Sequence, residues 1–204
     1  MARLEGRGVY AITDGPRTNL IAAVEAALAG GAAVLQYRDK TRDTTRRADE
    51  ARALRVACKR HAVPLIINDD IDLAMAIGAD GVHLGAEDSG IVEARQRLGE
   101  AAIIGVSCYA SIERARQLAA AGADYLAFGA FFASTTKPLA ARAAFPVLRD
   151  ARTLGLPLVA IGGINADNAP LLIDAGVDYL AVIASVFGAS DIESATRALA
   201  SCFT

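Results

Sequence analysis

The 204-residue sequence lacks the features that mark several common protein classes. Its three cysteines, Cys58, Cys108 and Cys202, do not have the spacing of a metal site. Without a secretory signal, we expect them to be reduced thiols. The formal net charge is only −2, which gives no electrostatic argument for binding nucleic acid or a membrane surface. No apolar run is long enough to span a membrane. These absences favour a cytoplasmic globular protein with neither nucleic-acid nor membrane partners.

Lysine is also scarce. Only Lys40, Lys59 and Lys137 occur among the 21 basic residues, and all the others are arginines. Lys59 lies in a charged helical stretch and needs no functional explanation. Lys40 and Lys137 each lie in a polar loop just after an apolar, strand-like segment. These two lysines are therefore candidates for a functional role.

Hydrophobic residues make up 53% of the chain, which is enough for the core of one domain spanning residues 1–204. Strand-like and helical patterns alternate along it. We expect strands at residues 8–13, 33–35, 64–68, 81–84, 102–106, 124–128, 157–161 and 178–183. We expect helices at residues 19–29, 44–61, 72–77, 89–98, 111–121, 167–175 and 192–201, with one more that follows a polar loop at 129–142 and ends at residue 154.

The alternation of strands and helices predicts the fold class. The strands are nearly continuous apolar runs, as in a parallel sheet with both faces buried. Segments 78–85, 121–132 and the stretch from 174 onward share one pattern, in which a helix end is followed by an acid and then by a buried strand. We predict a single-domain (β/α)8 TIM barrel. A doubly wound open sheet is the alternative, which the count of eight strands and the missing GxGxxG motif after the first strand disfavour.

Residues 66–88 place carboxylates at the ends of two neighbouring strands. Asp69 and Asp70 follow one strand, and Asp88 follows the next. Because like charges repel, gathering acids at one edge does not stabilise a fold. A divalent cation would explain the cluster, since hard cations take carboxylate oxygens as ligands. We interpret Asp70 as the N-cap of the following helix, and Asp69 and Asp88 as candidate Mg²⁺ ligands.

Other polar residues also follow the predicted strands, where a (β/α)8 barrel carries its catalytic groups. They are Gln36, Arg38, Lys40, Asn68, His83, Ser107, Tyr109, Ser134, Thr135, Thr136 and Lys137. The cations can neutralise phosphoryl oxygens, and the hydroxyls can donate hydrogen bonds to them. Gly162 and Gly163, with the turn after the last strand, are typical of a phosphate site made of backbone N–H groups. Two phosphate sites are therefore predicted.

Each of these features also has a structural interpretation. Asp69 could cap a helix, the glycine pair could be an ordinary turn, and residues 134–137 could be a solvated loop. His83 is best interpreted as a structural histidine with satisfied hydrogen bonds. The convergence of so many features on one face of a barrel favours function over structure for the set.

The motifs QYRDK, INDDIDLA, GADGVHLGAED, GVS, STTK and VAIGGI resemble those of the thiamine phosphate synthase family in order and spacing. The resemblance covers nearly the whole chain. It implies a barrel transferase of thiamine biosynthesis that joins hydroxymethylpyrimidine diphosphate to thiazole phosphate, giving thiamine phosphate and pyrophosphate. The implied mechanism is a dissociative displacement, in which Mg²⁺ and lysines stabilise the departing pyrophosphate.

The resemblance also implies roles for individual positions. Asp69 and Asp88 match the ligands of a Mg²⁺ cofactor. Arg38, Lys40, Ser107 and Lys137 match catalytic contacts with the diphosphate. Further substrate contacts are implied at Gln36, Tyr37, Asp39, Asn68, Ser134, Thr135, Thr136, Gly163, Ile183 and Ala184.

Some positions depart from the family pattern. They are Ala86 in place of Gln, Tyr109 in place of His, Ser134 in place of Thr, and Ala184 in place of Ser. The nearest alternative function is that of a thiazole tautomerase, which moves protons and needs neither metal nor diphosphate. The presence of Asp88 and Lys137 and the absence of a His at position 109 favour the synthase. A non-catalytic binder of thiamine phosphates is a third alternative, and a homo-oligomer is compatible with the sequence.

Overall fold

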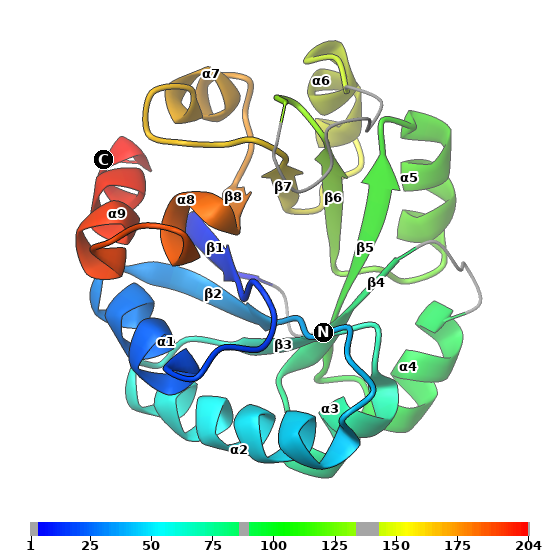
Figure 1. Ribbon diagram of the computed structural model, residues 1–204. Coiled ribbons are helices and arrows are strands. Elements are labelled where there is room, and N and C mark those ends of the chain that lie inside the picture. Colours follow the sequence, from blue (N-terminus) through cyan, green and yellow to red (C-terminus); the bar gives the residue numbers. More distant parts are fainter. Residues whose placement is uncertain (1–3, 86–89, 134–142, 204) are drawn as a thin grey trace.

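The computed structural model describes residues 4–85, 90–133 and 143–203, which form one closed barrel surrounded by helices (Figure 1). All neighbouring strands are parallel, and β1 closes the barrel by pairing with β8. The strands are β1 (Gly8–Ile12), β2 (Ala32–Tyr37), β3 (Leu65–Asn68), β4 (Gly81–Leu84), β5 (Ile103–Tyr109), β6 (Tyr125–Gly129), β7 (Leu158–Ile161) and β8 (Tyr179–Val182). The predicted (β/α)8 barrel is confirmed, and the open sheet is excluded.

The helices lie outside the barrel, and none within the described ranges is both long and apolar enough to cross a membrane. They are α1 (Leu20–Ala29), α2 (Thr44–Arg60), α3 (Ile71–Ile77), α4 (Gly90–Leu98), α5 (Ile112–Ala120), α6 (Pro146–Arg152), α7 (Ala169–Asp174), α8 (Ala184–Phe187) and α9 (Ile192–Ala200), followed by a 3₁₀ turn at Ser201–Phe203. The prediction that Asp70 is an N-cap is confirmed, because its carboxylate accepts a hydrogen bond from the Leu73 backbone N–H at 2.8 Å.

The predicted ends of the elements lie within two residues of the observed ends, with two exceptions. Helix α8 was not expected, because four residues are too few to show a helical repeat. Strand β5 continues to Tyr109, three residues beyond its predicted end. The extension passes through an irregularity in the pairing with β6 between Ser107 and Tyr109, which the apolar pattern does not reveal.

Strand alternation separates two apolar regions, because successive side chains of a strand point to opposite faces. On β2, Leu35 and Tyr37 belong to the outer region between strands and helices. Val34 belongs to the inner region inside the barrel, together with Tyr10 and Tyr125. The same alternation turns the side chain of Gln36 inward. Only every second residue of a strand can therefore contribute its side chain to the interior.

The repeated sequence pattern corresponds to a repeated contact at the amino-terminal ends of the strands. Asp80, Asp124 and Asp178 precede β4, β6 and β8, respectively. Each carboxylate accepts a backbone N–H near the start of the preceding strand, from Leu65 at 2.7 Å, Ile104 at 2.8 Å and Leu158 at 2.8 Å. Each acid also donates its own backbone N–H to the carbonyl of that same residue. The acid of the repeated pattern therefore has a structural role, since it joins two neighbouring strands.

Candidate active site

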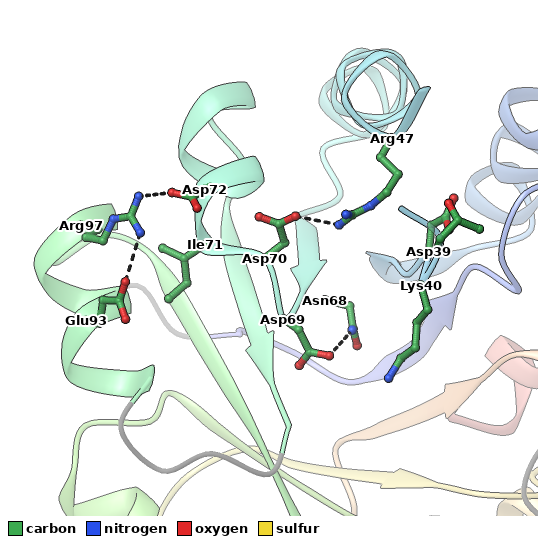
Figure 2. Close-up of a pocket in the computed structure, with 11 residues that line it drawn as sticks. Asp39, Lys40, Arg47, Asn68, Asp69, Asp70, Ile71, Asp72, Glu93 and Arg97 are labelled. Atoms are coloured by element: carbon green, nitrogen blue, oxygen red, sulfur yellow. Dashed lines mark hydrogen bonds and ion pairs between the residues drawn. The ribbon is translucent and has the colours of Figure 1, made fainter. Parts of the chain in front are cut away.

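An open pocket of about 530 Å³ lies at the carboxyl-terminal ends of β2 and β3. Residues that line it are Asp39, Lys40, Thr41, Arg47, Asn68, Asp69, Asp70, Ile71, Asp72, Glu93 and Arg97. Figure 2 shows the side chains of Lys40, Asn68 and Asp69 extending toward the same side of the pocket. The structure thus brings together residues that the sequence predicted from separate strand ends.

Two cations, Arg38 and Lys40, follow β2. Neither Arg38 nor Lys40 makes a side-chain hydrogen bond or ion pair with another residue in the described ranges. The end of β2 is held by Thr13, whose hydroxyl accepts the Arg38 backbone N–H at 2.8 Å and donates to the Arg38 carbonyl at 3.1 Å. Two cations with no carboxylate partner in this part of the chain are suited to bind phosphoryl oxygens.

Two other residues of the QYRDK segment have structural partners instead. The Tyr37 hydroxyl donates to Glu50 of α2 at 2.6 Å, so its side chain faces the helix layer. The Asp39 carboxylate accepts from the Thr41 backbone N–H at 2.7 Å and from Arg46 at 2.6 Å. Burial raises the pKa of Asp39, but these hydrogen bonds outweigh it and hold the pKa below its usual value. Both side chains are therefore engaged within the fold, although Asp39 also lines the pocket, and the substrate contacts expected at Tyr37 and Asp39 stay predictions. Alternation directs Tyr37 outward, and Asp39 orders the loop before α2.

Asp69 occupies an unusual backbone position at the end of β3. Its φ of 60° lies in the left-handed region, which residues other than glycine rarely adopt and which is frequent at functional sites. Its Oδ1 accepts the Gly85 backbone N–H at 3.1 Å, and its Oδ2 accepts the Asn68 side-chain amide at 2.7 Å. The carboxylate is therefore held in place between β3 and β4, while neighbouring Asp70 pairs with Arg47 at 2.7 Å.

The donor set at Asp69 suits a hard cation. An ionised carboxylate has about four lone-pair sites, so the two hydrogen bonds leave it able to ligate a metal. No group of three or more His, Cys, Asp or Glu side chains that could hold a metal occurs in the described parts of the chain. Mg²⁺ usually takes one or two carboxylates and completes its shell with water and substrate oxygens, so Asp69 could supply one such ligand. The second predicted ligand, Asp88, lies outside the described residues, as do Ala86, Ser134, Thr135, Thr136 and Lys137.

His83 projects from β4 into the barrel. Its Nδ1 lies 2.9 Å from the Tyr125 hydroxyl, and its Nε2 lies 2.9 Å from the Ser107 hydroxyl. Burial lowers the pKa of His83 to about 4, although the charge of Asp69 opposes this shift. The imidazole is therefore neutral at pH 7, and the prediction of a histidine with satisfied hydrogen bonds is confirmed.

Sequence reasoning missed two tyrosines inside the barrel. The hydroxyls of Tyr10 on β1 and Tyr125 on β6 lie 2.6 Å apart, and the Gln36 side-chain amide donates to Tyr10 at 2.9 Å. Burial raises the pKa of both tyrosines well above 10, so both are protonated at pH 7. Their inward positions could have been predicted from strand alternation, but their meeting across the barrel could not.

Arg114 of α5 is a further residue that the sequence did not single out. It donates to the Ser107 carbonyl at 2.9 Å and to the Gly85 carbonyl at 3.1 Å, which ties the ends of β4 and β5 together. Its guanidinium also lies 5.7 Å from the ring centre of Tyr109, an exposed residue with a φ of 55°. Arg114 thus contacts both the backbone of Ser107 and the ring of Tyr109.

The predicted backbone phosphate site lies at the ends of β7 and β8. Gly163 has a φ of 62°, and a Cβ atom there would lie 2.2 Å from the Ala133 carbonyl oxygen, so only glycine fits. Ile183 caps α8, and Ala184 is its first residue. The Ser185 hydroxyl donates to the Ile164 carbonyl and thereby links the two strand ends. The structure thus places the predicted residues Gly163, Ile183 and Ala184 at the carboxyl-terminal face of the barrel.

Comparisons with known proteins agree with this geometry. Residues 9–186 match the family model described as thiamine monophosphate synthase. The chain is 54% identical over 195 residues to the thiamine-phosphate synthase of Thiobacillus denitrificans, which covers 94% of this chain and 92% of the relative. It is 51% identical over 201 residues to the thiamine-phosphate synthase of Thioalkalivibrio sulfidiphilus, which covers 97% of this chain and 95% of the relative.

Solved structures give the same result. The thiamine phosphate pyrophosphorylase from Pyrococcus furiosus superposes with a TM-score of 0.86 at 36% identity, covering 96% of this chain and 95% of that one. A 3-hexulose-6-phosphate synthase superposes with a TM-score of 0.70 at 18% identity, covering 96% of this chain and 100% of that one, a likeness of fold alone. Sequence and structure comparisons therefore converge on one family.

Proposed function

The chain belongs to the thiamine monophosphate synthase family, and from this premise we propose how its pocket carries out the reaction. It is a thiamine-phosphate synthase, a transferase of thiamine biosynthesis. In our proposal the substrates are hydroxymethylpyrimidine diphosphate and thiazole phosphate, and the products are thiamine phosphate and pyrophosphate. The pyrimidine diphosphate binds over the ends of β2 to β5, and the thiazole phosphate binds toward β7 and β8.

One observation supports this placement above the others. Arg38 and Lys40 have no ion-pair partner in the described residues, and Lys40 lines a pocket that Asp69 also lines. Unpaired cations next to a positioned carboxylate suit a diphosphate that carries a bound metal. Neither group would suit an uncharged ligand, because the cations and the carboxylate would then have to lose hydration without compensation.

The chain's own residues act by charge stabilisation and positioning. Arg38 and Lys40, with Lys137, hold the diphosphate as its bond to the pyrimidine methylene breaks. Ser107 donates to a phosphoryl oxygen, while Asn68 and Gln36 orient the pyrimidine. The thiazole nitrogen then attacks the methylene cation. The reaction needs charge stabilisation and positioning more than a general base, and positioned charges of this kind are the largest catalytic contribution in many enzymes.

Asp69, with Asp88, would hold Mg²⁺ on the diphosphate. When bound, the ion would neutralise negative charge on the departing pyrophosphate. Because one or two carboxylates make a weak site by themselves, tight binding of the ion should require the diphosphate.

The tautomerase alternative needs a residue that takes and returns a proton near neutral pH. Tyr109 is a poor choice, because an unperturbed tyrosine has a pKa near 10. Both ring nitrogens of His83 already lie within hydrogen-bonding distance of hydroxyls, and burial lowers its pKa to about 4. We therefore expect synthase activity without tautomerase activity. Replacing Tyr109 by His should change the synthase rate by no more than about tenfold.

The test is an assay of the purified protein with both substrates, with and without Mg²⁺. We expect thiamine phosphate to form with Mg²⁺ and its formation to stop in a chelator. Full activity in the chelator would overturn the metal assignment, and absence of product with Mg²⁺ would overturn the choice of substrates. A cytoplasmic location and a homo-oligomeric state stay predictions.

A further inference from the structure

Five polar side chains, each from a different strand, form one continuous hydrogen-bond chain across the barrel interior. The heavy-atom distances are 2.9 Å from Gln36 Nε2 to the Tyr10 hydroxyl, 2.6 Å from Tyr10 to the Tyr125 hydroxyl, 2.9 Å from Tyr125 to His83 Nδ1, and 2.9 Å from His83 Nε2 to the Ser107 hydroxyl. The His83 ring also stacks on Tyr125 with ring centres 5.6 Å apart. The two ends are proposed substrate contacts, whereas the three middle residues have no assigned role in the reaction.

The proton positions in this chain follow from its first member. Nε2 of Gln36 can only donate, so the Tyr10 oxygen accepts. The single hydroxyl proton of Tyr10 is then directed to the Tyr125 oxygen, because no other acceptor for it occurs in the described residues. In turn, the proton of Tyr125 is directed to His83 Nδ1.

The remaining steps determine what Ser107 offers at the barrel mouth. A neutral imidazole carries one proton, and here Nδ1 is an acceptor, so the proton is on Nε2. Nε2–H then donates to the Ser107 oxygen. The hydroxyl proton of Ser107 therefore has no acceptor among the residues that the structure describes and is left for a ligand.

We infer that this chain is directional and that it couples the hydrogen-bonding roles of Gln36 and Ser107, which contact a ligand at its two ends. In the direction described, Ser107 acts as a donor and Gln36 presents its carbonyl oxygen as an acceptor. Reversal requires every member to turn at once, including the amide of Gln36. Tyr10, Tyr125 and His83 are thus positioning residues that act through the two ends.

The direction has a consequence for the ligand, and this step rests on the proposed function. A complementary ligand has a proton-free oxygen near Ser107 and an N–H donor near Gln36. A phosphoryl oxygen of a diphosphate meets the first requirement. In the reverse direction, the Ser107 lone pairs would face that oxygen, which would lose a hydrogen bond and add repulsion.

The tautomer of His83 reports the direction, and ¹⁵N NMR of the protein alone measures it. The chain contains only two histidines, so a His61→Gln variant leaves His83 as the single signal. We expect Nε2–H in this background at pH 8. Adding Gln36→Glu should change the signal to Nδ1–H, because a carboxylate only accepts and therefore reverses every bond between residue 36 and His83. Adding Tyr10→Phe as well should abolish the effect of Glu at position 36. An Nδ1–H tautomer in the starting protein, or the same tautomer with and without Gln36→Glu, would overturn the inference.

Kinetics supply the second readout. Loss of one neutral hydrogen bond is worth about 0.5–1.5 kcal/mol. Tyr10→Phe and Tyr125→Phe should therefore each lower kcat by a factor between about two and ten. The KM for thiazole phosphate should not change. Tyr179→Phe is the matched control, because its hydroxyl donates to the Glu5 carbonyl at the opposite end of the barrel, 2.8 Å away. It should change neither kcat nor the tautomer of His83.

Unchanged kcat in both Tyr10→Phe and Tyr125→Phe would overturn the positioning role. Loss of the tautomer switch refutes the inference whatever the synthase rate, whereas a missing synthase activity in the unmodified protein refutes the proposed function alone.

Discussion

Oδ1 of Asp69 accepts a hydrogen bond from the backbone N–H of Gly85 at 3.1 Å, so a carboxylate joins the end of β3 to the end of β4. This contact holds the proposed metal ligand at the barrel mouth in a left-handed backbone conformation. The position of the carboxylate is therefore fixed before any substrate binds.

Replacing Asp69 tests this assignment. Asn tolerates the left-handed region, so Asp69→Asn should keep the backbone while removing the charge. We expect turnover to fall by at least about 10²-fold with an unchanged melting temperature, since a positioned charge is lost. Asp72→Asn removes an acid of the same pocket whose exposed side chain pairs with Arg97 instead. That variant should stay close to normal activity, and equal losses in both would refute a specific role for Asp69.

The two cations after β2, Arg38 and Lys40, give a second prediction. Lys40→Ala and Arg38→Ala should each lower kcat/KM by about 10²-fold, because each removes a group that stabilises the departing diphosphate. Steady-state assays with saturating Mg²⁺ measure the effect. Lys59→Ala on the exposed side of α2 is the control for loss of a lysine charge. Near-normal rates for both Lys40→Ala and Arg38→Ala would show that these cations do not contribute to catalysis.

Asp39 gives a pH-dependent prediction that separates a structural from a substrate-binding role. Its pKa is lower in the folded protein than the ordinary 3.8, so its contribution to stability is present above about pH 4 and is lost as the pH falls through the folded pKa. Asp39→Asn should lower the free energy of unfolding by about 1.5–3 kcal/mol at pH 7, the scale for hydrogen bonds to a charged group. Urea unfolding at pH 7 and at pH 3 should show the difference shrinking at the lower pH. A stability difference that does not depend on pH would refute the contribution of the charge.

Gly105 of β5 gives a prediction about the barrel interior. A Cβ atom at this position would lie 1.8 Å from the ring of Tyr125, so Gly105→Ala must displace the ring or the strand. Overpacking of this kind typically costs about 1–3 kcal/mol, which is about 2–12 °C in melting temperature for a chain of this size. Thermal unfolding measures the loss. Combining Gly105→Ala with Tyr125→Val should restore part of the lost melting temperature, because the smaller side chain removes the clash. An unchanged melting temperature in the double variant would mean that the clash involves another residue.

Much of the fold follows from the sequence, because each strand is an apolar run between polar turns. The same patterns located Asp69, Lys40 and Ser107, since carboxyl-terminal strand ends meet at one face of a parallel barrel. Helix α8 could not be predicted, because a single helical turn leaves no periodic signal.

The interior of the site was harder to predict for a geometric reason. Taking consecutive residues such as Gln36 and Tyr37 as one binding segment ignores alternation, which turns Gln36 into the barrel and Tyr37 toward α2. The contact between Tyr10 and Tyr125 depends on which strands face each other across the closed barrel, and residues 115 positions apart carry no local signal of it.

The carboxylates of Asp80, Asp124 and Asp178 also bear on how such a barrel could arise. Each one binds the strand before its own, so β3 with β4, β5 with β6, and β7 with β8 form three similar pairs. Each strand–helix–strand unit contains the Asp hydrogen bond that joins its two strands. Such a unit can be duplicated in evolution, because the copy brings this stabilising contact with it. These Asp hydrogen bonds lie at the end of the barrel opposite the pocket. The loops that line the pocket can therefore change in sequence without disturbing the contacts that hold each strand pair together.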